Sequence, residues 1–270
     1  MTKTVGIIGW PVEHSRSPKM HNAAFAALGL DWQYILLPTP LDGLEATLAR
    51  IRSGEIFGAN VTIPHKQTMI PLLDEIEPAA AAIGAVNTIA LRGDRLIGYN
   101  TDVLGFTRSL LEAGVEVKDK PCAILGAGGA ARAVVVALRQ LGASITLYAR
   151  DVAKAQSLMG IGAARALTEL DQIDRATVLI VNTTPLGMSP QIEGSAWPAN
   201  LAFPSKALAF DLIYNPARTR WMQQAERSGN RAINGLPMLI YQGAAAFEMW
   251  TGQSAPIGVM RETLLDADVR

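Results

Sequence analysis

Residues 122–150 constrain the fold of this chain more than any other segment. A short apolar run, residues 122–125, leads into the glycine-rich loop 126–131. An alanine-rich helical pattern follows, and a second apolar run ends at Tyr148. This order predicts a strand, a tight turn, a helix and a second, parallel strand. A glycine loop between such a strand and such a helix is typical of a dinucleotide-binding unit. The same glycines without those neighbours would indicate only a turn.

Each small residue of the loop has a predicted task. Gly126 permits the tight turn, Gly128 lets the backbone approach a pyrophosphate, and Ala131 allows the helix to pack closely on the strand. The free amides and partial positive charge of the helix N-terminus favour the phosphates. We therefore expect the cofactor to contact Gly126, Ala127, Gly128, Gly129 and Ala130.

The residue that ends the second strand selects the cofactor. An acidic residue there would bind the ribose hydroxyl of NAD, whereas an arginine accommodates the 2′-phosphate of NADP. This chain has Arg150, with Lys154 one turn further on, so NADP is favoured. Asp151 leaves an alternative open: it either caps the next helix or contacts a ribose hydroxyl and tolerates NAD.

Composition excludes several classes of protein. The 270 residues are 49% hydrophobic, their net charge is zero, and the sequence shows neither a basic cluster nor an apolar run long enough to span a membrane. The first residues read as a strand rather than a signal peptide. The single cysteine and the three histidines do not form a disulfide or a metal-site pattern. We expect a soluble cytoplasmic protein that binds a small molecule, without nucleic acid, membrane or metal.

Strand and helix patterns alternate twice along the chain, which predicts two α/β domains. Before the glycine loop, strands are expected at 5–8, 33–37, 56–62, 86–91 and 96–99, and helices at 18–28, 41–52, 65–73, 78–83 and 102–113. After it, strands are expected at 178–182 and 208–212, and helices at 237–250 and 260–267.

Two serines precede the first predicted helix. Ser17, followed by Pro18, has the pattern of an N-cap, so it needs no further function. Ser15 is not explained by capping. Two hydroxyls beside a helix N-terminus make a plausible carboxylate site.

Lys66 and Asp102 are the candidate proton-transfer groups. Lys66 follows a strand and Pro64, where a helix is predicted to begin, and a cation there opposes the helix dipole. That field would favour the neutral amine, which helps proton transfer; the alternative is an ordinary surface lysine. Asp102 is either an acid in the first turn of a helix or the partner of Lys66. Sequence spacing does not show whether the two side chains meet.

Together, eight collinear segments resemble the shikimate dehydrogenase family over nearly the whole chain. They are GWPVEHSRSP, NVTIPHK, GAVNTI, GYNTD, GAGGAARA, NTTPLGM, DLIYNP and GLPMLIYQGAAAFEMWTG. The resemblance implies reversible, NADP-dependent reduction of 3-dehydroshikimate to shikimate in the pathway to chorismate and the aromatic amino acids. Hydride would pass to the C3 carbonyl, with Lys66 as general acid or base paired with Asp102.

The resemblance also implies roles for further residues. The substrate would be held by Ser15, Ser17, Thr62, Lys66, Asn87, Asp102, Tyr214 and Gln242. The nicotinamide end of the cofactor would lie near Leu212, Gly235 and Met238. The implied fold has an N-terminal α/β substrate-binding domain, residues 1–102, which regains the C-terminal helices 237–270. Residues 103–236 form the Rossmann-type NADP-binding domain.

One departure from the family affects the cofactor. Many members read Asn-Arg-Thr after the second strand of the nucleotide domain, whereas this chain reads Ala149-Arg150-Asp151. We expect a preference for NADP that is weaker than usual. Two alternatives stay open: an NAD-dependent quinate/shikimate dehydrogenase and a non-catalytic shikimate-binding homologue. Assembly is open too, with a homodimer as one state.

Overall fold

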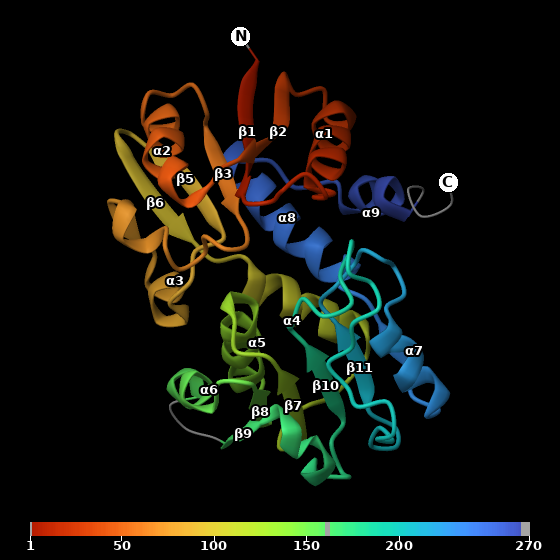
Figure 1. Ribbon diagram of the computed structural model, residues 1–270. Helices are drawn as coiled ribbons and strands as arrows, with labels where there is room; N and C mark the ends of the chain where they lie inside the picture. The colour runs from red at the N-terminus through yellow and green to blue at the C-terminus, as the bar shows by residue number, and fades with distance from the viewer. Residues whose placement is uncertain (1, 160–162, 266–270) are drawn as a thin grey trace. The chain divides into compact units, whose positions relative to one another are not determined.

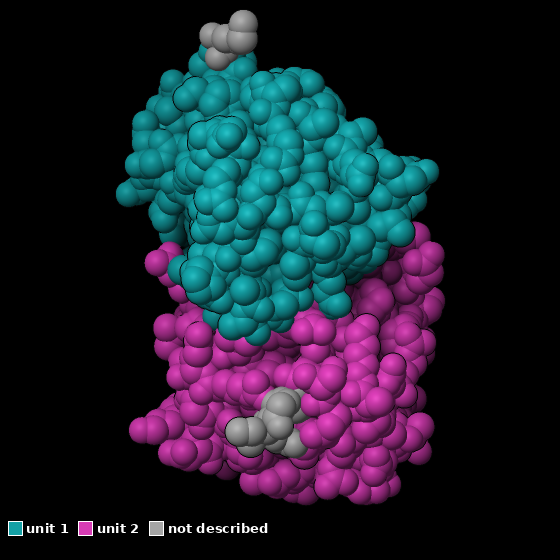
Figure 2. Space-filling model, turned by 90° about the vertical axis from the view of Figure 1, so that its left-hand side faces the viewer, with its two compact units in different colours: residues 1–105, 239–270 teal, residues 106–238 magenta. Residues whose placement is uncertain are grey.

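The computed structural model describes residues 2–159 and 163–265 of the chain. These form two compact units. Unit 1 comprises residues 1–105 and 239–270, and unit 2 comprises residues 106–238 (teal and magenta in Figure 2). Both unit boundaries fall inside helices, α4 (Asp102–Glu112) and α8 (Leu236–Thr251). None of the described helices is long and apolar enough to cross a membrane.

Unit 1 contains a mixed six-stranded sheet in the order β2-β1-β3-β5-β6-β4. Its strands are β1 (Lys3–Gly9), β2 (Trp32–Pro38), β3 (Gly58–Val61), β4 (Glu75–Ile76), β5 (Thr88–Arg92) and β6 (Arg95–Tyr99). Its helices are α1 (Ser17–Ala27), α2 (Leu44–Arg52), α3 (Pro78–Ile83) and α9 (Ile257–Leu265), with 3-10 turns η1 (Leu41–Gly43) and η2 (Ile70–Leu72).

The register of this sheet brings distant segments to one edge. β1 and β3 run parallel, whereas β5 runs antiparallel to β3, with Asn60 opposite Thr88. β6 is antiparallel to β5, with Tyr99 opposite Thr88. The residues that follow β1, β3 and β6 and those that precede β5 therefore lie at the same edge of the sheet.

Unit 2 contains a parallel six-stranded sheet in the order β12-β11-β10-β7-β8-β9. This is the doubly wound order of dinucleotide-binding folds, in which the strand order reverses beside β7. Its strands are β7 (Pro121–Leu125), β8 (Ser144–Ala149), β9 (Ala163–Ala166), β10 (Leu179–Asn182), β11 (Leu208–Asp211) and β12 (Ala232–Ile233). The helices, which can be followed in Figure 1, are α5 (Gly129–Gln140), α6 (Val152–Met159) and α7 (Arg220–Arg227), with the 3-10 turn η3 (Leu167–Gln172).

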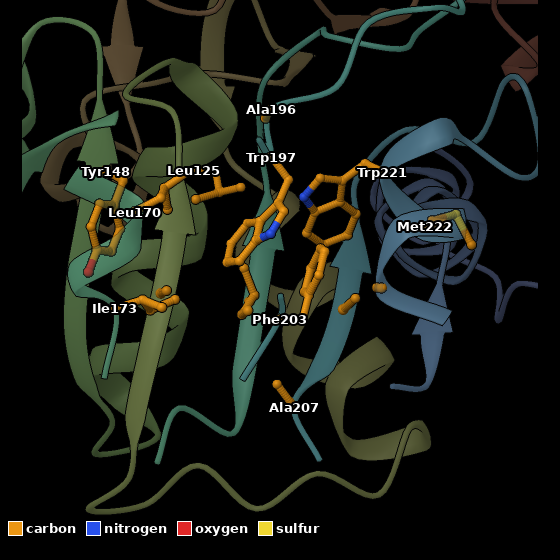
Figure 3. Close-up of a cluster of buried hydrophobic side chains, with 14 residues drawn as sticks. Leu125, Tyr148, Leu170, Ile173, Ala196, Trp197, Phe203, Ala207, Trp221 and Met222 are labelled. Atoms are coloured by element: carbon orange, nitrogen blue, oxygen red, sulfur yellow. The ribbon is translucent and has the colours of Figure 1, made fainter. Parts of the chain in front are cut away.

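A cluster of buried side chains packs against one side of the unit 2 sheet (Figure 3). Its centre is aromatic: Trp197 stacks on Phe203 with ring centroids 4.1 Å apart, and Trp221 of α7 meets Phe203 edge-on at 5.6 Å. Strand residues such as Leu125 and Tyr148 complete the cluster. Because aromatic rings bury large apolar areas, this cluster fixes the long segment between β10 and β11 against the sheet.

Most predicted elements are present, and two local predictions are wrong. Residues 65–73 form successive turns and η2 instead of a helix, because Pro71 lacks the amide that would bond back to residue 67. Ser17 is not the N-cap of α1 but its first residue; Arg16 occupies the cap position and makes no capping hydrogen bond with its side chain. The sequence analysis missed β4, β9, α7 and β12. The last predicted helix is α9, and residues 266–267 lie outside the described residues.

Candidate functional site

The structure brings Lys66 and Asp102 together in unit 1. Lys66 Nζ lies 2.5 Å from Asp102 Oδ2, although 36 residues separate them in sequence. The Asp102 side chain is 6% exposed and that of Lys66 17%, so both side chains of the pair are largely shielded from solvent. Lys66 follows β3 and Asp102 follows β6, so the two side chains meet at the shared edge of the sheet. A charge pair that keeps one partly exposed proton donor is suited to acid–base chemistry.

Two amide side chains adjoin the carboxylate. Asn87 Nδ2 donates to Asp102 Oδ1 at 2.9 Å and approaches Gln242 Oε1 at 3.4 Å. Gln242 lies on α8, and its own amide donates to the Leu239 carbonyl at 2.9 Å. Of the expected substrate ligands, Lys66, Asn87, Asp102 and Gln242 thus form one connected group.

The reasoning that placed Lys66 at a helix N-terminus is wrong, because no helix begins there. The backbone is held instead by turn bonds, from Met69 N to His65 O at 2.9 Å and from Val86 N to Lys66 O at 2.8 Å. The second bond ties Lys66 to the segment that carries Asn87. The lysine is thus positioned by the sheet edge and its carboxylate partner rather than by a helix dipole.

The hydroxyl residues lie at the same sheet edge. Ser17 is buried, and its amide donates to Ser15 Oγ at 3.3 Å. Thr62 directly follows β3, and a Cβ added at Gly9 would come within 2.4 Å of its methyl group. Gly9 therefore allows the close approach of the chain that leads to the serines. No bond between these hydroxyls and the Lys66–Asp102 pair is recorded among the described residues.

The glycine loop of unit 2 has the geometry that dinucleotide binding needs. Gly126 has φ +108°, and a Cβ there would lie 2.6 Å from Thr183 Oγ1, so a larger residue would be strained. At Gly128, by contrast, no described atom lies within 4 Å of an added Cβ. No described side chain caps the N-terminus of α5. Open space therefore faces a helix N-terminus, as a pyrophosphate requires.

Arg150 directly follows β8 and borders a cavity of about 490 Å³. The cavity is also lined by residues after β9 and by the segment around Trp197. Asp151 accepts a hydrogen bond from the Lys154 amide at 2.9 Å, which is the capping geometry of α6. Its carboxylate is therefore engaged by the helix, and the Arg150 side chain is exposed.

The residues expected near the nicotinamide come from two segments of unit 2. A Cβ added at Gly235 would lie 2.1 Å from the Leu212 carbonyl oxygen, so only glycine fits there. Gly235 N also donates to Ile213 O at 3.0 Å. Met238 is buried in the first turn of α8, and Tyr214, an expected substrate ligand, is half-buried in the segment after β11.

Sequence reasoning missed Asp211, the fully buried last residue of β11. Its carboxylate accepts from Thr219 Oγ1 at 2.5 Å, Asn182 Nδ2 at 3.0 Å and Ile213 N at 3.1 Å. Burial raises its pKa from 3.8 to about 6, against the lowering effect of these bonds. An acidic residue at the end of an apolar run was the only signal in the sequence.

The fold and the two groups of residues define a dinucleotide-binding α/β protein with a lysine–carboxylate pair. Two family models match the chain: the shikimate dehydrogenase substrate binding domain over residues 7–89, and the shikimate 5′-dehydrogenase C-terminal domain over residues 235–265. The chain belongs to the shikimate dehydrogenase family, which confirms the resemblance seen in the sequence.

Individual relatives support this membership over the full length. The shikimate dehydrogenase (NADP(+)) of Moorella thermoacetica is 45% identical, and the match covers 98% of this chain and 94% of the relative. A crystal structure of a shikimate dehydrogenase in complex with NADP⁺ has a TM-score of 0.92 at 40% identity, covering 100% of this chain and 96% of the other. The enzyme of Thermus thermophilus, in complex with NADP(H) and shikimate, has a TM-score of 0.89 at 38% identity, covering 98% and 100%.

Proposed function

We propose that this chain is an NADP-dependent shikimate dehydrogenase that interconverts 3-dehydroshikimate and shikimate. The observation that carries the proposal is the Lys66–Asp102 pair, joined at 2.5 Å and bounded by the amides of Asn87 and Gln242. An ammonium, a carboxylate and neutral amides suit a polyhydroxylated ring, because they donate to and accept from several hydroxyls at once.

NADP, when bound, supplies or takes up the hydride. Lys66 donates a proton to the oxygen at C3 as the carbonyl becomes an alcohol, and in the reverse direction its neutral amine accepts that proton. Asp102 holds the amine in position, and Asn87 holds Asp102. The serines Ser15 and Ser17 bind the substrate carboxylate. The remaining substrate ligands are Thr62, Tyr214 and Gln242.

In this proposal each domain has one task. Residues 1–102 and 237–270 are the substrate-binding and catalytic domain, and residues 103–236 bind NADP. The residues of unit 2 fit such a cofactor: Gly128 leaves space before α5, and Arg150 is the cation for a 2′-phosphate. Leu212, Gly235 and Met238 hold the nicotinamide end, and Lys154 supports Arg150.

Nicotinamide absorbance tests the proposal with purified protein. Shikimate with NADP⁺ is expected to give rapid reduction of the cofactor, and NAD⁺ or quinate much less. Comparable rates with quinate and NAD⁺ would assign the protein to the catabolic alternative. Shikimate binding without any turnover would instead indicate a binding homologue. Homodimer formation and cytoplasmic localisation stay predictions, which light scattering and cell fractionation test.

A further inference from the structure

A buried chain of hydrogen bonds leads from Tyr34 to Asp102 within unit 1. Tyr34 Oη bonds to Asn60 Oδ1 at 2.7 Å, and Asn60 Nδ2 to Thr88 Oγ1 at 3.0 Å. Thr88 Oγ1 bonds to Asn87 Oδ1 at 3.0 Å, and Asn87 Nδ2 to Asp102 Oδ1 at 2.9 Å. The first four side chains are each at most 3% exposed. The expected substrate ligands include Asn87 and Asp102, but Tyr34, Asn60 and Thr88 are outside that set.

The direction of every bond in this chain follows from two fixed groups. The amide N–H of Thr101 can only donate, and it lies 2.8 Å from Asn87 Oδ1, so the Asn87 oxygen is on that side and its NH₂ faces Asp102. The carbonyl of Asn87 can only accept, and it lies 3.2 Å from Asn60 Nδ2.

With these two amides oriented, the hydroxyl protons are also determined. Asn60 donates to the Thr88 hydroxyl, and the Thr88 proton goes to Asn87 Oδ1 at 3.0 Å, because that amide oxygen can only accept and the other neighbour, Thr101 Oγ1, is farther away at 3.5 Å. The Asn60 oxygen in turn accepts from the Tyr34 hydroxyl. All donors point the same way, from Tyr34 towards the Asp102 carboxylate that holds Lys66. Aligned hydrogen bonds polarise and strengthen one another in a buried site.

We propose that Thr88, with Asn60 and Tyr34 behind it, is a positioning residue that fixes the Asn87 amide and so the Asp102–Lys66 pair. This inference rests on the proposed function, because the pair matters only if it transfers a proton. Thr88 is fully buried on β5, so it acts through Asn87 and not through contact with substrate.

The test compares Thr88→Val, which removes the hydroxyl and keeps the shape, with Thr88→Ser, which keeps the hydroxyl. Thr88→Val is expected to lower kcat about three- to tenfold, the usual effect of one hydrogen bond, while NADP⁺ affinity stays unchanged. Thr88→Ser is expected to stay within about twofold of the native kcat for the same reason. Thr4→Val is the matched control, since Thr4 is on β1 of the same sheet and its hydroxyl bonds only to Gln33 among the recorded partners.

A folded Thr88→Val enzyme with native kcat would overturn the proposal, and so would an equal loss in Thr88→Ser. If Thr88→Val does not fold, Tyr34→Phe replaces it, with a smaller expected loss of kcat and an unchanged kcat as the contradicting result. A protein without shikimate turnover would refute the proposed function instead. In that case, nuclear magnetic resonance of the Asn87 side-chain amide tests whether Thr88 fixes this amide. Its signals must shift in Thr88→Val and not in Thr88→Ser, and identical signals in all three proteins would overturn the inference.

Discussion

Each unit contains one buried carboxylate among the described residues, and their surroundings differ. Asp102 in unit 1 pairs with the amine of Lys66, whose side chain is partly exposed. Asp211 in unit 2 accepts bonds only from neutral groups, and its pKa is raised to about 6 by burial. A buried carboxylate paired with a partly exposed lysine side chain can take part in proton transfer, whereas one surrounded by neutral donors holds loops together.

The difference extends to the candidate residues of the two units. In unit 1 the candidate groups are side chains: an amine, a carboxylate, amides and hydroxyls gathered at one sheet edge. In unit 2 they are mainly backbone features, an open glycine position and an uncapped helix start within the described residues. Function in unit 1 should therefore depend on the chemical identity of side chains. Function in unit 2 should depend on the space that small residues leave.

The largest expected effect is at Lys66. Lys66→Ala removes the proton donor and should lower kcat by a factor on the order of 10²–10⁴, the usual contribution of general acid–base catalysis. NADP⁺ affinity should be almost unchanged, because the residues proposed to bind the cofactor are in unit 2. Steady-state kinetics and a fluorescence titration of NADPH check both expectations. Lys118→Ala, on the surface of unit 2, is the control, and a kcat near that of the native protein would make Lys66 purely structural.

Asp211 should instead affect stability, with a defined sign. The pKa of Asp211 is about 6 in the folded state and 3.8 in the unfolded state. Its contribution to the free energy of unfolding is therefore complete below pH 3.8 and is lost as the pH rises through about 6. The difference corresponds to roughly 3 kcal/mol. His21 has the opposite sign, because burial lowers its pKa from 6.5 to about 3 and favours the folded state at higher pH.

Urea unfolding of the native protein and of Asp211→Asn between pH 4 and 7, in roughly half-unit steps, isolates the Asp211 contribution. As the pH rises through this range, the native protein should lose stability relative to Asp211→Asn. The contribution of His21 cancels in the comparison, because both proteins contain it. Parallel pH profiles would mean that Asp211 keeps an ordinary pKa. The comparison of the two carboxylates would then fail.

A substitution at Gly128 tests whether cofactor binding by unit 2 depends on the space that this glycine leaves open. Its φ of −89° and ψ of −171° suit any residue, and a Cβ there meets no described atom within 4 Å, so Gly128→Val should fold normally. The added methyl groups should displace the pyrophosphate and lower kcat/KM for NADP⁺ by about 10²-fold, as misplacement by about 1 Å can. Gly258→Ala on α9, which is equally open, is the control. Unchanged cofactor kinetics would place the phosphates elsewhere.

The core strands and the glycine loop could be predicted because both have local causes. The apolar runs of β1, β7 and β8 must be buried, and a tight turn after β7 needs the positive φ that Gly126 provides. β12 has only two residues and no pattern to detect. α7 buries only Trp221, Met222 and Ala225, so its sole local signal was Thr219, whose side chain caps it.

The candidate site was predictable only in part, because its geometry is not local. Asp102 and Lys66 could each be singled out, but their contact depends on antiparallel pairing between β3, β5 and β6. The helix dipole invoked for Lys66 was wrong, because Pro71 prevents that helix. The orientation of the Asn87 amide depends on a hydrogen-bonding network that no spacing rule reveals.

The smallest expected effect concerns cofactor choice at Arg150. A guanidinium that holds the 2′-phosphate by charge-assisted bonds contributes enough that Arg150→Ala should weaken NADPH binding roughly 10- to 50-fold. NADH, which lacks that phosphate, should bind almost as before, and titrating both cofactors gives the ratio of their affinities.

Asp151→Asn is the matched variant. Asparagine can still cap α6, so removal of the negative charge should strengthen NADPH binding a few-fold. If Arg150→Ala lowered the affinities for NADPH and NADH equally, Arg150 would not distinguish the two cofactors. Cofactor recognition by unit 2 would then depend on its backbone features alone.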